Sequence, residues 1–153
     1  MSDQGWHRFV CRVTGLTTLG DTGDFFSLIG GTTPWRFIGL RVWQRGSTTL
    51  FMDAIRIHRG VAGGITGTPT EHKYGTSGPV ATVTASQLPT VDVGTDDLDV
   101  GVGWNILQEA VWMPTPKEWI PCQASDDIGI AKEGTTGHTL VGVTAVWEEY
   151  IGS

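Results

Sequence analysis

The residues of this chain that could do chemistry are histidines, clustered acids, cysteines and one serine in a Gly-rich turn. The histidines are widely spread, at His7, His58, His72 and His138. A β fold could gather some of them around a metal, but the paired His-x-His with a downstream Glu that such sites use is missing. Ser77 lies in Gly-Thr-Ser-Gly, without the Gly-x-Ser-x-Gly spacing of a nucleophile elbow. These patterns predict no metal site and no catalytic residue.

Two acidic clusters could supply the oxygen ligands that calcium prefers. One pairs Asp21 with Asp24, and the other comprises Asp92, Asp96, Asp97 and Asp99. Neither has the twelve-residue spacing or the closing Glu of an EF-hand, which favours solvated acidic turns and leaves calcium binding by the run 92–99 open. Glu148 and Glu149 are adjacent, so on a strand they face opposite ways and cannot form an acid/base pair.

The remaining reactive groups indicate no cofactor. Cys11 and Cys122 could form a disulfide, but in a reducing compartment we expect two buried thiols. Their spacing is not a metal signature. The Gly-rich segment 60–67 and Gly30-Gly31 lack the Lys of a phosphate-binding loop.

The aromatic residues point to binding. If Ile38 and its alternate neighbours in 36–44 face the core, the opposite face of that strand carries Trp35, Phe37, Arg41 and Trp43. Trp and Arg are enriched at interface hot spots, so we predict a subunit interface there. The alternative is that another part of the same chain covers this face.

Alternation with period two defines the elements that position these side chains. It is strongest at 98–106 and 139–147, where Trp104 and Trp147 fall on the apolar face, and it recurs at 36–44 and 51–57. By the same alternation, Trp6 is expected in the core. Weaker strands are expected at 7–14, 25–29, 80–85, 109–112, 118–122 and 127–131.

Composition agrees with a β fold. The 153 residues include 22 Gly and 21 Thr, both poor choices for helix interiors. About ten short strands predict an all-β, antiparallel β-sandwich in one domain over 1–153, with a jelly roll as first choice and an immunoglobulin-like sandwich as second. Residues 1–6 are expected to form an N-terminal arm. The segment 60–79, with six Gly and two Pro, is expected to form a long loop.

Charge and hydropathy exclude several classes of partner. A net charge of −6 argues against non-specific nucleic-acid binding. Residues 1–60 carry seven Arg and four Asp, whereas 61–153 carry three Lys and twelve acids. Either the two halves lie side by side in one domain, or opposite charges meet between subunits. No signal-peptide pattern is seen, and no apolar stretch approaches the about 18 residues of a membrane span, so we expect cytosolic synthesis and no membrane contact.

Several segments, in order, resemble those of small virion proteins of tailed bacteriophages. They are Arg41-Val42-Trp43-Gln44-Arg45, Ile55-Arg56-Ile57-His58-Arg59-Gly60, Gly63-Gly64 with Thr68-Pro69, Trp112-Met113-Pro114-Thr115-Pro116-Lys117-Glu118, and Val146-Trp147-Glu148-Glu149. The resemblance covers about residues 35–150. It implies a non-enzymatic jelly-roll protein of the virion, of the capsid decoration or cement type, present in the host cytoplasm during assembly. The implied partners are copies of itself in a homotrimer and the major capsid protein. No functional residue carries over.

Two other functions stay open. Seven Trp on a β scaffold are also typical of a carbohydrate- or receptor-binding module, here of a phage tail or neck. A cupin-like or glycan-cleaving enzyme would need at least two His or carboxylates that converge in a pocket.

Overall fold

The structure of this chain is a computed structural model that describes residues 5–16, 23–45, 52–60, 71–73, 78–89, 96–105, 108–134 and 140–152. Within these ranges the regular structure is β-strand, apart from one 3-10 turn, Pro116–Glu118. The strands are β1 (Trp6–Leu16), β2 (Asp24–Ile29), β3 (Trp35–Gln44), β4 (Met52–Gly60), β5 (Glu71–Lys73), β6 (Thr84–Gln87), β7 (Asp96–Asn105), β8 (Ala110–Trp112), β9 (Ile120–Cys122), β10 (Asp127–Lys132) and β11 (Val141–Tyr150).

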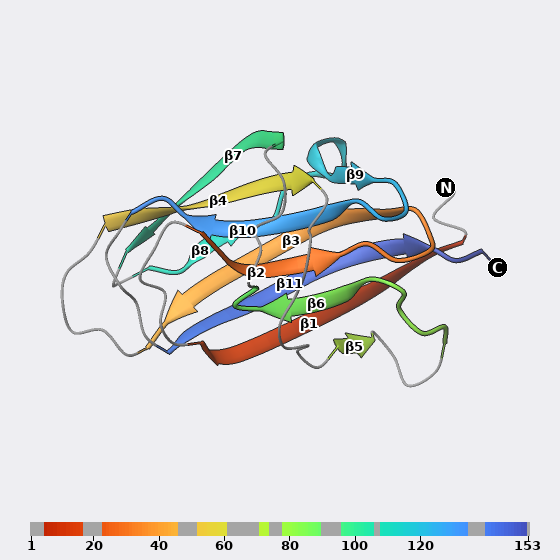
Figure 1. Ribbon diagram of the computed structural model, residues 1–153, viewed down its shortest axis with the longest axis horizontal. Helices are drawn as coiled ribbons and strands as arrows, with labels where there is room; N and C mark the ends of the chain where they lie inside the picture. Colours follow the sequence, from red (N-terminus) through yellow and green to blue (C-terminus); the bar gives the residue numbers. More distant parts are fainter. Residues whose placement is uncertain are drawn as a thin grey trace.

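The strands form two antiparallel sheets that pack face to face (Figure 1). The first sheet has the order β5-β1-β11-β3-β8, with β9 also paired to β3, and the second has the order β6-β2-β10-β4-β7. Strands β1 to β4 pair in reverse order with β11, β10, β8/β9 and β7, as in a long hairpin rolled into a sandwich. This nesting is the topology of a jelly roll, and the all-β prediction is confirmed.

Every described strand pairing joins a strand of residues 1–60 to a strand of residues 61–153. Strands from the basic half therefore alternate with strands from the acidic half across both sheets. The uneven charge along the sequence becomes neighbouring opposite charge within one domain.

The core lies between the sheets, where the alternation expected from the sequence is largely confirmed. The inward residues of β11, Val141, Val143, Ala145 and Trp147, are all fully buried. Trp104 is buried as expected, and Leu98, Val100 and Val102 of β7 pack against the core. Cys11 and Cys122 are both buried and are not joined by a disulfide, as expected from the sequence.

Two local expectations differ from the structure. Residues 60–79 were expected to form a loop, but Glu71–Lys73 pair with β1 as β5; positions 61–70 and 74–77 lie outside the described residues. Trp6 was expected both in an N-terminal arm and in the core. Instead it begins β1, opposite Tyr150, and is half-buried outside the core cluster. No helix among the described residues is long and apolar enough to cross a membrane.

Candidate functional site

The four residues predicted to share one face of β3 are divided between its two faces. Trp35 and Phe37 are fully buried members of the core, so their predicted place on the outer face is wrong. Arg41 is exposed and Trp43 half-buried on the outer face, as expected. Their role in a subunit interface stays a prediction.

A β-bulge explains the division. In the ladder between β3 and β11, Gly39 pairs with Val146 but Phe37 pairs with Trp147, so Ile38 is an extra residue on β3. One extra residue reverses the inward and outward alternation. The inward and outward assignment made from residues 38–42 is therefore reversed for the residues that precede the bulge.

The outer face of the first sheet carries an assembly of arginines and indoles, which we call the Arg–Trp face. Its members project from β1, β3 and β11 or lie at the edge beside them. They are Trp6, Arg8, Arg12, Arg36, Arg41, Trp43, Glu109, Trp119, Thr144 and Glu148. The sequence predicted an outer face that carries Trp and Arg, but of the members of the Arg–Trp face this prediction included only Arg41 and Trp43.

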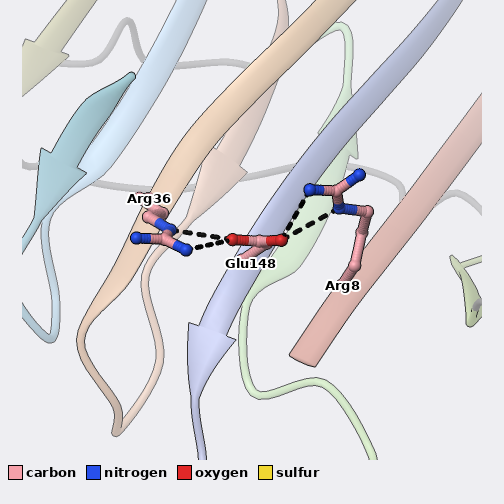
Figure 2. Close-up of polar contacts among 3 residues, drawn as sticks. All are labelled: Arg8, Arg36 and Glu148. Atoms are coloured by element: carbon pink, nitrogen blue, oxygen red, sulfur yellow. Dashed lines mark hydrogen bonds and ion pairs between the residues drawn. The ribbon is translucent and has the colours of Figure 1, made fainter. Parts of the chain in front are cut away.

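Arg8, Glu148 and Arg36 form one row across β1, β11 and β3 (Figure 2). One carboxylate oxygen of Glu148 accepts from Arg8 Nε at 2.9 Å and from its Nη2 at 2.7 Å. The other accepts from Arg36 Nε at 2.8 Å and lies 2.6 Å from its Nη2. Each guanidinium group contacts one oxygen through two nitrogens, so Glu148 is held in a defined orientation between two arginines.

Indole rings flank the arginines of this first row. The Arg36 guanidinium carbon lies 4.2 Å from the centroid of the Trp6 ring and 4.7 Å from that of Trp119. Trp6 in turn packs edge-on against Tyr150, with ring centroids 5.5 Å apart. Cation–π contacts and ion pairing thus fix this end of the Arg–Trp face.

A second row lies further along the same three strands, where Arg12 pairs with Thr144 and Thr144 with Arg41. Arg41 forms an ion pair with Glu109, which precedes β8. Arg12 and Arg41 are both exposed, and Thr144 between them is half-buried. The centre of this row holds a short neutral side chain where the first row holds a carboxylate.

Trp43 borders the second row. Its ring lies against the backbone of Gly142, where any Cβ would overlap the indole, and the Arg12 guanidinium carbon lies 5.4 Å from the ring centroid. Beside the ring is an open hollow of about 560 Å³ lined by Arg12, Arg41, Trp43, Glu109 and Thr144. Arginine donors and an aromatic wall suit this hollow to binding planar or anionic groups.

Glu148 and Glu149 point to opposite faces, as expected for neighbours on a strand. Glu149 is fully buried and accepts from Trp147 Nε1 at 2.9 Å and from the backbone N–H of Thr82 at 2.8 Å. It connects β11 to the segment before β6, whereas Glu148 serves the Arg–Trp face. The two carboxylates do not form a joint site.

The other chemical candidates do not converge among the described residues. Continued alternation from 51–57 places His58 on the outer face of its strand, but it is buried and bonded to Asp24. His7 bonds the carbonyl of Gly152 at 3.0 Å, and His72 lies in β5. No group of three or more potential metal ligands is found in the described ranges.

Other candidates fall outside what the structure describes. Positions 77, 92 and 138 lie outside the described residues, as do the side chains of Asp96, Asp97 and Asp99. Calcium binding by the acidic run 92–99 therefore stays a prediction.

The Cys122 thiol is not suited to nucleophilic chemistry. Burial raises the pKa of its thiol from 9.0 to about 12, and the nearby Asp126 carboxylate adds to the increase. A thiol with such a pKa is neutral at physiological pH and is a poor nucleophile.

Comparison with known proteins gives little information about identity. No family model and no curated protein matches the chain. The structure of infectious bursal disease virus Gx strain is similar at 12% identity and a TM-score of 0.22, covering 95% of this chain and 41% of that one. The infectious bursal disease virus VP2 subviral particle is similar at 14% identity and a TM-score of 0.20, covering 95% and 42%. The chain spans about two-fifths of these viral chains, and at such TM-scores the likeness carries no argument.

Proposed function

We propose that this chain is a non-enzymatic structural protein of a tailed-phage virion, of the capsid decoration or cement type. It assembles with copies of itself as a homotrimer and binds the major capsid protein, first in the host cytoplasm and then on the particle. Its mechanism is to add contacts across the shell and so stabilise it by mass action.

The observation that carries this proposal is the Arg–Trp face. It is a broad sheet face in which arginines and indoles are held by ion pairs and cation–π contacts. These residue types dominate the energetics of protein interfaces, and side chains that are already ordered lose little entropy on binding. The order of the phage-like segments in the sequence, together with the jelly-roll topology, supports a virion role for such a face.

The experiment is reconstitution on particles of the same phage that were assembled without this protein. Purified chain is mixed with these particles, the particles are pelleted, and bound protein is titrated to saturation. We expect saturable binding and a higher temperature of shell opening. Failure of the wild-type chain to bind such particles would overturn the proposed function.

A pair of variants tests the role of the face. Trp43→Ser removes an indole of the Arg–Trp face, and Met52→Ser removes a fully solvated apolar side chain of the second sheet, 93% exposed. We expect the first to weaken particle binding at least about tenfold and the second to leave it unchanged. Equal binding by the two variants would show that particle binding does not use Trp43.

The hollow beside Trp43 supports a second candidate, a carbohydrate- or receptor-binding module of a phage tail or neck. A sugar ring can stack on an indole while Arg, Glu and Thr side chains bond its hydroxyls. Saturable change of Trp fluorescence with host polysaccharide, lost in Trp43→Ser, would favour this function. No response in the wild-type chain would exclude it for the polysaccharides tested.

A further inference from the structure

The two rows of the Arg–Trp face have the same arrangement of residues on β1, β11 and β3. Arg8 and Arg12 are four residues apart on β1, as are Glu148 and Thr144 on β11. On β3 the spacing from Arg36 to Arg41 is five, because the bulge adds one residue and returns Arg41 to the outer face. Each row therefore places one arginine on β1 and one on β3, with a β11 residue between them.

The first row shows what fits between the two arginines. There the carboxylate of Glu148 bonds both guanidinium groups through two nitrogens each. In the second row Thr144 is too short to reach the equivalent position and has no charge. The hollow of about 560 Å³ lies there. The second row is thus an arginine pair with room for a carboxylate from outside.

The arginines of the second row are held ready for such a ligand. Glu109 pairs with a terminal nitrogen of Arg41, and a guanidinium has five N–H donors to share. Arg12 packs over the Trp43 ring. Pre-ordered donors lower the entropic cost of binding.

We infer that this hollow binds an Asp or Glu side chain from a second copy of the chain, an inference that rests on the self-assembly proposed above. Charge complementarity favours that source. The Arg–Trp face carries four arginines against two glutamates, whereas the chain as a whole has a net charge of −6. A neighbouring copy is therefore a rich source of carboxylates.

The geometry of the Arg–Trp face limits which acids of the second copy can take part in this contact. The two acids of the Arg–Trp face, Glu109 and Glu148, are already paired with arginines of their own chain. The incoming carboxylate must therefore come from another acid of the second copy. Such a contact can occur twice in a two-fold dimer or once per interface in a head-to-tail ring such as a trimer.

The decisive variant is Thr144→Glu, which gives the second row its own carboxylate. Its control, Thr144→Gln, has nearly the same size without the charge. We expect Thr144→Glu to weaken self-association at least about tenfold while melting no lower than the wild type, and Thr144→Gln to associate much more tightly than Thr144→Glu. Sedimentation velocity over a concentration series measures the association, and 500 mM NaCl should weaken the wild-type assembly through screening.

A second variant tests the same inference independently, in case Thr144→Glu does not fold. Arg12→Gln alters an exposed side chain, and we expect it to weaken association like Thr144→Glu with an unchanged circular dichroism spectrum. Equal association of wild type, Thr144→Glu and Arg12→Gln would overturn the inference. So would a wild-type chain that stays monomeric, including one that instead binds glucuronate with a saturable fluorescence change.

The experiments distinguish failure of this inference from failure of the proposed function. If Thr144→Glu assembles normally while the wild type binds particles, the inference fails and the virion role stands. If association depends on residue 144 but no form binds particles, the inference stands and the virion role fails.

Discussion

Replacement of Glu149 by Ala should cost a large part of the folding free energy. Its side chain is fully buried in β11. One carboxylate oxygen accepts from Thr82 N at 2.8 Å, Thr82 Oγ1 at 2.6 Å and Thr33 Oγ1 at 3.2 Å. Val83 N lies 3.3 Å from both oxygens, and Trp147 Nε1 donates to the other oxygen at 2.9 Å. Each of these donors is neutral, so their number, rather than an opposite charge, compensates for burial of the carboxylate.

The magnitude follows from the donors that alanine would leave unpaired. Each buried donor without an acceptor costs about 1–3 kcal/mol, and two backbone N–H groups and one indole N–H lose theirs. The hydroxyls of Thr33 and Thr82 already lie 3.1 Å apart and can bond each other, and removal of a buried charge returns some free energy. We therefore expect Glu149→Ala to lose about 3–5 kcal/mol, against a total of about 5–15 kcal/mol for a domain. Glu149→Gln keeps one acceptor oxygen and should lose about 1–3 kcal/mol.

Urea denaturation followed by Trp fluorescence measures these differences. Glu133→Ala is the matched control, because Glu133 is exposed and its loss should change stability by no more than about 0.5 kcal/mol. If Glu149→Ala lies within about 1 kcal/mol of this control, the reasoning on buried donors is wrong.

Three further predictions follow from other buried contacts. Glu148→Gln removes the charge shared by both arginines of the first row and should cost about 1–3 kcal/mol in urea denaturation, with a smaller loss in 1 M NaCl; a loss that salt leaves unchanged would contradict this. Gly129→Ala should cost about 1–3 kcal/mol, because a Cβ there would overlap His58 and Asp24; stability equal to wild type would show that the pair can move aside. The Cys122 thiol should resist Ellman's reagent at pH 8 in the folded protein and react in urea. Its pKa rises from 9.0 to about 12 on folding, so stability should fall as pH increases between these values; fast native reaction would refute the burial.

Much of the fold could be predicted because apolar residues at every second position of a strand are the ones that face the core. Positions 141, 143, 145 and 147 alternate in the sequence and are all buried in β11. By contrast, β5 has three residues in a Gly-rich stretch. Three residues are too few to display a period, and this strand depends on the edge of β1 for its hydrogen bonds.

The site was harder to predict because it depends on one inserted residue. In the run Trp-Arg-Phe-Ile-Gly-Leu, Gly39 is a signal for a bulge, but the position of the extra residue is defined only by the register against β11. Without it, Trp35 and Phe37 are assigned to the same face as Arg41. Arg36 is lost from the site by the same error. Trp119 was missed for a different reason, because it reaches the face from beside β9, across a tertiary contact.

The topology explains why basic and acidic residues are divided along the sequence. It leaves the net negative charge of the chain unexplained, and that charge bears on assembly. Because basic-half and acidic-half strands alternate across both sheets, Arg8, Arg36 and Arg41 each meet a carboxylate from the other half. The division of charge along the sequence is therefore consistent with folding of a single chain and needs no second subunit. Ion pairing within the chain does not change its net charge of −6, however, and Arg8 and Arg36 share the single carboxylate of Glu148. The chain as a whole therefore keeps an acidic surplus, while its first sheet presents Arg12 beside an unfilled row. In a ring of such molecules, each contact that places a surplus carboxylate in that row reduces the repulsion between copies that the surplus would otherwise cause.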